Sequence, residues 1–263
     1  MNIETITWTG SQAPNLDAVW VSEFGGAALG TFGGSRLKGG YKNEDGALLW
    51  RGRSWTFACL IDGHNSSQST DAILRLLEAR RSHISAMADC ELPAAFSQLR
   101  AALPGLFLDS SDILARVQGE AACLICFQKG GFLLWFSVGD NLALLLHHDL
   151  EKLRQSMLNS RQFFEWIGER SALELDVPCY SMGVRELRQG NNHIVLATDG
   201  LLSMCAREDE LGLTLFKMID AHTAPANLVR NSLARVQAAH GRDSASMVAW
   251  TVRNECGGLW PSS

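Results

Sequence analysis

The stretch Leu60-Ile61-Asp62-Gly63-His64 decides the fold of this chain. It closes the apolar run 55–61, which reads as a buried strand paired with 47–50 around the turn 51–54. A buried strand with an acidic residue, a glycine and a histidine at its tip is unusual for a purely structural turn. Since functional groups are commonly held at the ends of rigid elements, the stretch predicts a site at this end of the strand.

The same arrangement recurs along the chain. Four further apolar runs have acidic residues beside one end: 47–50 after Glu44-Asp45, 132–138 before Gly139-Asp140, 193–198 before Asp199-Gly200, and 247–252 soon after Asp243. Carboxylates that converge repel one another unless protons or cations neutralise them. A hard divalent cation is the simplest partner for several ionised carboxylates, so the pattern predicts a cation site.

Composition is that of an ordinary soluble chain. The residues are 46% hydrophobic and 19% charged. The length of 263 residues predicts one large domain or at most two domains. A net charge of −5 without a basic cluster favours no nucleic-acid partner. No segment predicts a signal peptide or a membrane span, which needs about 20 apolar residues. The seven scattered cysteines favour free thiols in a reducing compartment, so we expect a cytoplasmic protein without a membrane partner.

Periodicity predicts a layered α+β domain, because groups of strands alternate with groups of helices. The glycine-rich segment 25–40 is expected to form a loop and a strand pair. Strands are also predicted at 4–9, 18–24, 47–50, 55–61, 121–128, 132–138, 142–147, 193–198 and 247–252. Helices are predicted at 73–88, 92–102 (ended by Pro104-Gly105), 150–170, 209–221 and 227–239.

Five motifs then carry a resemblance, in order and rough spacing: Asn43-Glu44-Asp45, Asp62-Gly63-His64, Val138-Gly139-Asp140, Thr198-Asp199-Gly200-Leu201 and Gly241-Arg242-Asp243-Ser244. From about residue 25 to 252 the chain resembles the metal-dependent serine/threonine protein phosphatases of the 2C type. The resemblance implies a four-layer β-sandwich of two mainly antiparallel sheets flanked by helices on both sides. It further implies a single domain, 1–263, with a core of about 18–253 and a short tail, 254–263.

The resemblance also implies a binuclear Mg²⁺ or Mn²⁺ centre with a possible weaker third ion. By this likeness Asp62 bridges two metals, Gly63 offers its carbonyl and Glu44 ligates the second ion. Asp199 and Asp243 ligate the first ion. Asp45 supports metal-bound water, Asp140 helps to hold the third ion, and His64 protonates the leaving oxygen. The implied activity is hydrolysis of phosphoserine and phosphothreonine in proteins by a metal-activated water, opposing a serine/threonine kinase in a bacterial signalling system.

Departures from the family pattern concern the substrate more than the metals. The family commonly has an arginine where this chain has Gly40, and Arg36, Lys38 or Lys42 are candidates to replace it. Asn65-Ser66, Asn141-Leu142 and Ser244 replace usual family residues beside the motifs, and the short segment 178–190 predicts a small flap.

Simpler interpretations and other functions compete with the enzyme. Each Asp-Gly pair alone is a favoured turn. A catalytically weak or inactive regulator that binds phosphoproteins is the main rival, and Gly40 favours it. A phosphatase with an aspartyl-phosphate intermediate needs an Asp-x-Asp pair, which neither Asp62-Gly63-His64 nor Asp199-Gly200-Leu201 supplies. Cys123 and Cys126 are expected to pack in the core, and His147-His148 to lie at the surface or a strand end without a partner.

Overall fold

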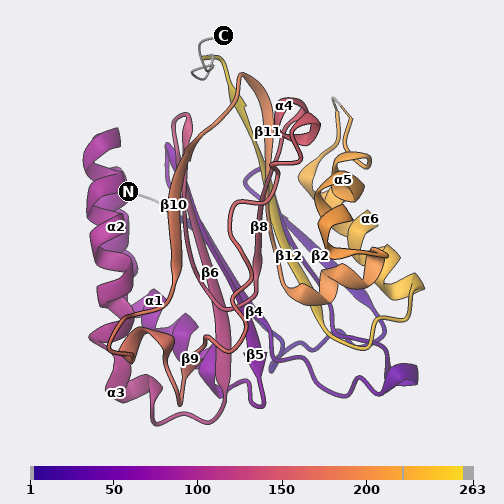
Figure 1. Cartoon of the computed structure of the whole chain (residues 1–263), viewed down its shortest axis with the longest axis horizontal. Coiled ribbons are helices and arrows are strands. Elements are labelled where there is room, and N and C mark those ends of the chain that lie inside the picture. Colours follow the sequence, from indigo (N-terminus) through magenta and orange to yellow (C-terminus); the bar gives the residue numbers. More distant parts are fainter. Residues whose placement is uncertain (1–2, 221, 257–263) are drawn as a thin grey trace.

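A computed structural model describes residues 3–220 and 222–256, and its strands form two sheets (Figure 1). The first sheet contains β1 (Glu4–Thr9), β4 (Gly46–Arg51), β5 (Trp55–His64), β6 (Glu120–Lys129), β7 (Phe132–Val138), β9 (Ile167–Gly168) and β10 (Ser181–Glu186). Its order is β1-β4-β5-β6-β7-β10, with β9 paired to β6. The second sheet contains β2 (Val19–Phe24), β3 (Ala27–Phe32), β8 (Leu142–Leu146), β11 (Gly190–Ala197) and β12 (Ala245–Asn254), in the order β2-β3-β12-β11-β8.

Helices cover the outer face of each sheet, which gives four layers (Figure 1). On the first sheet lie α1 (Gln68–Asp89), α2 (Leu92–Leu108) and α3 (Ser111–Leu114). On the second lie α5 (Leu211–Phe216) and α6 (Pro225–Ala238), while α4 (His148–Lys152) follows β8. Short 3-10 turns are η1 (Arg36–Lys38), η2 (Ala172–Glu174), η3 (Asp199–Met204) and η4 (Glu208–Glu210). Every strand pairing among the described residues is antiparallel, so the predicted four-layer α+β sandwich is confirmed.

The first sheet is buried on both faces, which explains the continuous apolar run of β5. Successive side chains of a strand point to opposite faces. Phe57 and Cys59 therefore pack with the helices, whereas Ala58 and Leu60 pack against the second sheet. All four residues are fully buried. The strand is thus the central wall between two hydrophobic layers.

The second helix runs further than predicted. α2 continues to Leu108 with Pro104 inside it, although the prediction ended the helix near residue 102 because proline removes a backbone donor. Leu103 and Phe107, close to the proline on either side, are buried in the layer between the helices and the first sheet. Their burial offsets the lost hydrogen bond, and the helix does not end there.

The helix predicted over 150–170 is wrong, because only the short α4 forms there. The following backbone pairs with β8 instead, where Leu158 N donates to Ala143 O at 2.9 Å. Leu153 and Phe164, members of the predicted apolar face, are exposed. Their helical spacing therefore does not mark a buried surface.

Two further expectations need correction. The predicted helix 209–221 is replaced by η4 and α5, and Ala221 lies outside the described residues. The segment 178–190, for which a small flap was predicted, contains β10, an edge strand that pairs with β7.

Most of the predicted tail, residues 257–263, also lies outside the described residues. No helix of the described chain is long and apolar enough to cross a membrane.

Candidate metal centre

Strand register brings six carboxylates to one end of the sandwich. β4 starts where β5 ends, since Gly46 pairs with Ile61. In the second sheet Ala197, at the end of β11, pairs with Leu142 of β8 and Met247 of β12. The loops and strand ends at this edge carry Glu44, Asp45, Asp62, Asp140, Asp199 and Asp243. Motifs far apart in the sequence therefore meet because antiparallel pairing returns each strand to the same edge.

Asp62 points into the gap between the sheets. It lies two residues beyond Leu60, which packs in the layer between the sheets, and so shares its face. The carboxylate is largely buried, and His64 Nδ1 lies 3.8 Å from its Oδ1. The His64 ring packs edge-on against Trp166, with centroids 4.3 Å apart. His64 is thus adjacent to the acidic cluster, at the last residue of the strand.

Hydroxyl groups of the second sheet hold Asp45. Ser246 Oγ donates to Asp45 Oδ2 at 2.6 Å, and Ser244 Oγ donates to Oδ1 at 2.8 Å. Thr198 Oγ1 lies 3.4 Å from Oδ2, and the Asp45 backbone N–H donates to Asn43 Oδ1 at 3.0 Å. A carboxylate that precedes a strand of one sheet is thereby fixed to the other sheet. Neither Thr198 nor Ser246 was singled out as a site residue from sequence, because a hydroxyl on a buried strand gives no periodic signal.

Burial and mutual repulsion raise the pKa of several of these carboxyls. Burial raises the pKa of Asp62 well above its usual range, and the charges of Asp45 and Asp199 raise it further. Burial also raises the pKa of Asp45 to about 7, although the Ser246 hydroxyl opposes the shift. For Asp199 burial raises the pKa to about 6, and the charge of Asp140 adds to this. The fold therefore holds carboxyls together at a cost that protons or cations must offset.

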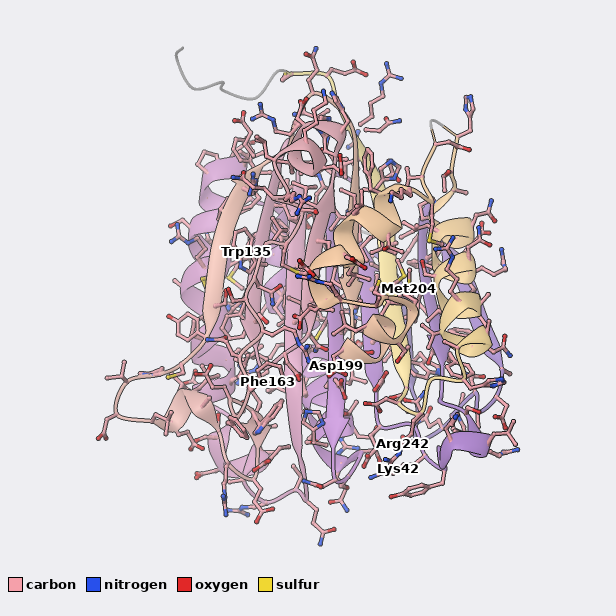
Figure 2. All side chains as sticks on the ribbon, turned by 45° about the vertical axis from the view of Figure 1, so that its right-hand side comes forward. Lys42, Trp135, Phe163, Asp199, Met204 and Arg242 are labelled. Atoms are coloured by element: carbon pink, nitrogen blue, oxygen red, sulfur yellow. The ribbon has the colours of Figure 1, made fainter. Side chains whose placement is uncertain are left out.

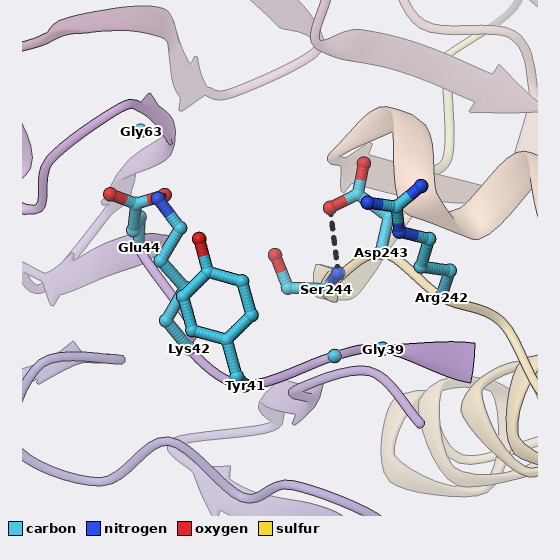
Figure 3. Close-up of a pocket in the computed structure, with 9 residues that line it drawn as sticks. Gly39, Tyr41, Lys42, Glu44, Gly63, Arg242, Asp243 and Ser244 are labelled. Carbon is cyan, nitrogen blue, oxygen red and sulfur yellow. Dashed lines mark hydrogen bonds and ion pairs between the residues drawn. The ribbon is translucent and has the colours of Figure 1, made fainter. Parts of the chain in front are cut away.

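A pocket of about 330 Å³ opens beside Glu44 and Asp243 (Figure 3). Its lining consists of Gly39, Gly40, Tyr41, Lys42, Glu44, Gly63, Arg242, Asp243 and Ser244. Lys42 and Glu44 lie on one side, and Arg242 lies with Asp243 on the other. Lys42 Nζ is 2.5 Å from Glu44 Oε2. The pocket thus combines acidic ligands with two cationic side chains.

Arg161 joins three of the acidic loops, and sequence reasoning missed it. Its Nη2 lies 2.9 Å from Asp199 Oδ2 and 3.4 Å from Asp140 Oδ2, and its Nη1 lies 3.0 Å from Glu208 Oε2. The sequence prediction placed Arg161 inside the helix 150–170, where an arginine reads as a solvated side chain. Figure 2 shows that Asp199, Lys42 and Arg242 come from different elements and lie toward the same end of the molecule.

Comparison with solved structures identifies the fold. A variant of a bacterial serine phosphatase matches with a TM-score of 0.62 and 13% identity, over 96% of this chain and 99% of that chain. RsbX in complex with magnesium matches with a TM-score of 0.56 and 12% identity, over 89% and 100%. The catalytic domain of the serine/threonine protein phosphatase PstP with two manganese ions matches with a TM-score of 0.54 and 17% identity, over 95% and 98%. This chain has the fold of the 2C-type phosphatases. No model of a protein family matches the sequence, and no curated protein sequence matches it.

The donor set suits the divalent cations that are bound in two of these 2C-type structures. All six candidate side chains offer carboxylate oxygens, which Mg²⁺ and Mn²⁺ prefer. Asp140 Oδ1 is buried and has no hydrogen-bond partner among the described residues. Gly63 lets β5 approach the Glu44 loop, because a Cβ at this position would lie only 2.6 Å from Glu44 O. The residues present therefore fit a hard cation.

A side chain at position 40 would be crowded by the surrounding backbone. A Cβ at residue 40 would lie 3.0 Å from Ser35 O and 3.1 Å from Arg242 O. Of the three candidate replacements for the family arginine, Lys42 lines the pocket, whereas Arg36 and Lys38 are not among its lining residues. Arg242, which stands beside the fifth motif, lines the same pocket and had no role in the sequence prediction.

Residues outside the centre were predicted with mixed success. Cys123 packs with the helices and Cys126 with the second sheet, and both thiols are free and buried, as predicted. His147 is buried, and its Nε2 lies 2.9 Å from Gln189 O. The expectation that both histidines lack a partner is wrong, because His147 contacts Gln189 and His148 Nε2 lies 3.0 Å from Asp149 Oδ1. His148 is exposed on that helix.

Acid should stabilise the protein when no divalent cation is present. A carboxyl whose pKa is higher in the folded state than in the unfolded state binds more protons when folded, so stability falls as pH rises. The raised values of about 7 for Asp45 and about 6 for Asp199 place this fall between about pH 4 and pH 7. In a chelator we therefore expect the Tm to decrease by several degrees from about pH 5 to about pH 8, and Mn²⁺ to restore it.

Asp45→Asn is the matched variant for this measurement. It keeps the shape of the side chain but removes one raised pKa, so its Tm in chelator should vary less with pH. A wild-type Tm in chelator that is constant or increases over this pH range would contradict the electrostatic account of the cluster.

Proposed function

We propose that this protein is a divalent-cation-dependent phosphatase that hydrolyses phosphoserine and phosphothreonine in proteins. The observation that carries the proposal is the convergence of six carboxylates beside a pocket with cationic groups, on a 2C-type fold. Glu44, Asp62, Asp199 and Asp243, with the Gly63 carbonyl, would hold two ions. Bound Mg²⁺ or Mn²⁺ would lower the pKa of water and neutralise the charge of the phosphoryl oxygens.

The cationic side chains of the pocket are suited to the substrate phosphate. Lys42 and Arg242 line the pocket from opposite sides, and both lie close to the acidic candidate ligands (Figure 3). Arginine binds phosphate through a planar fork of two donors, whereas lysine acts as a point charge. Arg242 is therefore our candidate for the anchoring role that an arginine at position 40 would otherwise perform, with Lys42 in support.

His64 is our candidate for the group that gives a proton to the departing serine or threonine oxygen. Its Nδ1 side lies toward Asp62, and its Nε2 is buried without a partner in the part of the chain that is described. Histidine exchanges a proton near neutral pH. The Trp166 ring packs edge-on against His64 and would restrict the rotation of the imidazole.

Asp45 would act by linking the two sheets rather than by contacting the substrate. Its hydrogen bonds to Ser244 and Ser246 fix the loop before β4 to the start of β12. Glu44 and Asp243 lie next to these anchored residues in the chain. The network thus keeps two candidate ligands at a constant separation.

The rival function, binding of phosphoproteins without turnover, loses its main support. It was favoured by the missing arginine at Gly40, yet Lys42 and Arg242 supply cationic groups to the pocket. An opposing serine/threonine kinase, a bacterial signalling role and a cytoplasmic location stay predictions.

Hydrolysis of a phosphothreonine peptide tests the proposal. We expect turnover with Mn²⁺ or Mg²⁺ and none in a chelator. Asp62→Asn should reduce kcat by roughly 10²–10³-fold or more, because it weakens the binding of the ions that would neutralise the developing phosphoryl charge. Asp209→Asn, an exposed carboxylate outside the centre, is the control and should keep full activity.

The outcomes separate the candidate functions. Equal turnover by Asp62→Asn and wild type would contradict the assignment of the centre. No turnover with any metal, combined with calorimetric binding of Mn²⁺, would favour the phosphoprotein-binding regulator.

Replacement of Arg242 tests the proposed phosphate anchor. Hydrogen bonds to charged groups contribute about 1.5–3 kcal/mol, so Arg242→Gln should raise the KM for the peptide by roughly 10–100-fold with a smaller change in kcat. Arg36→Gln is the matched control, since Arg36 is exposed and pairs with Asp17 away from the pocket. An unchanged KM for Arg242→Gln would remove Arg242 from the substrate site.

A further inference from the structure

Arg161 is held against the acidic cluster by its own segment of chain. Gln162 N donates to Gly139 O at 3.0 Å, which ties this segment to the loop that carries Asp140. The guanidinium lies over the Phe163 ring, 4.5 Å from its centroid, and the Arg161 side chain is only 11% exposed. A cation over an aromatic face is attracted to the ring, most strongly where water is excluded. The guanidinium is therefore positioned by both the backbone and an adjoining side chain.

One guanidinium is shared by three carboxylates. Asp140 and Asp199 both face Nη2 through their Oδ2 atoms, and Glu208 faces Nη1. Asp140 follows β7, whereas Asp199 follows β11 of the other sheet. Arginine stays charged at any pH at which the protein is folded, and its fork suits several oxygens in one plane. Arg161 thus supplies a fixed positive charge that joins the two sheets.

The location of this charge restricts where divalent ions can bind. An ion between Asp140 and Asp199 would lie beside the guanidinium, and like charges that close repel strongly when little water separates them. Arg161 engages one oxygen of Asp199, which leaves the other oxygen for an ion. Asp199 can therefore contact the arginine and one metal ion together. The place between the Oδ2 atoms of Asp140 and Asp199 is filled by the guanidinium, and its charge opposes a further ion at Asp140 Oδ1, which has no hydrogen-bond partner among the described residues.

The charge balance points to the same limit. The six carboxylates of the centre and Glu208 carry seven negative charges when all are ionised. Lys42, Arg161 and Arg242 supply three positive charges, and two divalent ions supply the remaining four. A third divalent ion would leave excess positive charge in a largely buried site, which is costly.

We propose that Arg161 is a built-in cation of this centre, which occupies the place between Asp140 and Asp199 and limits the centre to two divalent ions. In this arrangement Arg161 is a positioning residue that orients Asp199, and Asp140 is its partner rather than the ligand of a weaker third ion. The inference rests on the proposed cation-dependent function, because it needs a centre that binds divalent ions.

Counting bound Mn²⁺ tests the inference without any measurement of activity. The full-length wild type and its variants are dialysed against saturating Mn²⁺, and the metal bound per chain is quantified. We expect two ions per wild-type chain and three per Arg161→Gln chain, because the freed carboxylates of Asp140, Asp199 and Glu208 then form a further site. Arg161→Lys keeps the charge and should bind two. Arg207→Gln, which removes an exposed arginine paired with Asp209, should also bind two.

A second variant keeps the inference falsifiable if Arg161→Gln does not fold. Asp140→Asn in a chain with intact Arg161 should still bind two ions, since Asp140 then serves only the arginine. Wild type that binds three ions and loses one in Asp140→Asn would overturn the inference, as would two ions in Arg161→Gln. Such results would leave the proposed function intact. Wild type that binds no Mn²⁺ would overturn the proposed function together with the inference.

Discussion

Repulsion among buried carboxylates is the constraint on which the rest of this structure depends. The fold holds Asp45 and Asp62 largely out of water beside three more aspartates, although burial and the neighbouring charges raise the pKa of both. Such an arrangement persists only where the surrounding structure determines it and where some cation or proton offsets the charge. The chain meets both conditions, through hydroxyl donors, two basic side chains and a pocket suited to divalent ions.

The two-sheet core supplies the rigidity that this site requires. β5 is buried on both faces, so its tip cannot shift without disturbing two hydrophobic layers. Across the gap, Ser244 and Ser246 fix Asp45, and Asn141 Nδ2 donates to Leu60 O at 3.2 Å. The acidic loops are consequently attached to both sheets. Packing far from the site thereby sets the separation of groups within it, which a cation of fixed radius requires.

What could be predicted from sequence was local in origin. The buried run before Asp62 predicted a central strand, and acidic residues at the ends of several runs predicted where loops would meet. Arg161 could not be found in this way, because its contacts with the acidic residues depend on where a segment without regular structure lies. The predicted helix 150–170 was wrong because its apolar residues do not form one buried face. The backbone of this segment forms hydrogen bonds with β8 instead. Arg242 was visible beside the fifth motif, but only the pocket gives it a role.

Proton release on Mn²⁺ binding tests the central claim most directly. Calorimetric titrations at about pH 6, in two buffers with different ionisation enthalpies, measure the protons that leave the protein as the metal binds. If the fold raises the pKa of carboxyls such as Asp45, these groups hold protons at about pH 6 that a bound cation displaces. Binding then releases protons at about pH 6 and fewer at about pH 8. Heats that do not depend on the buffer at about pH 6, or no Mn²⁺ binding at all, would contradict the account.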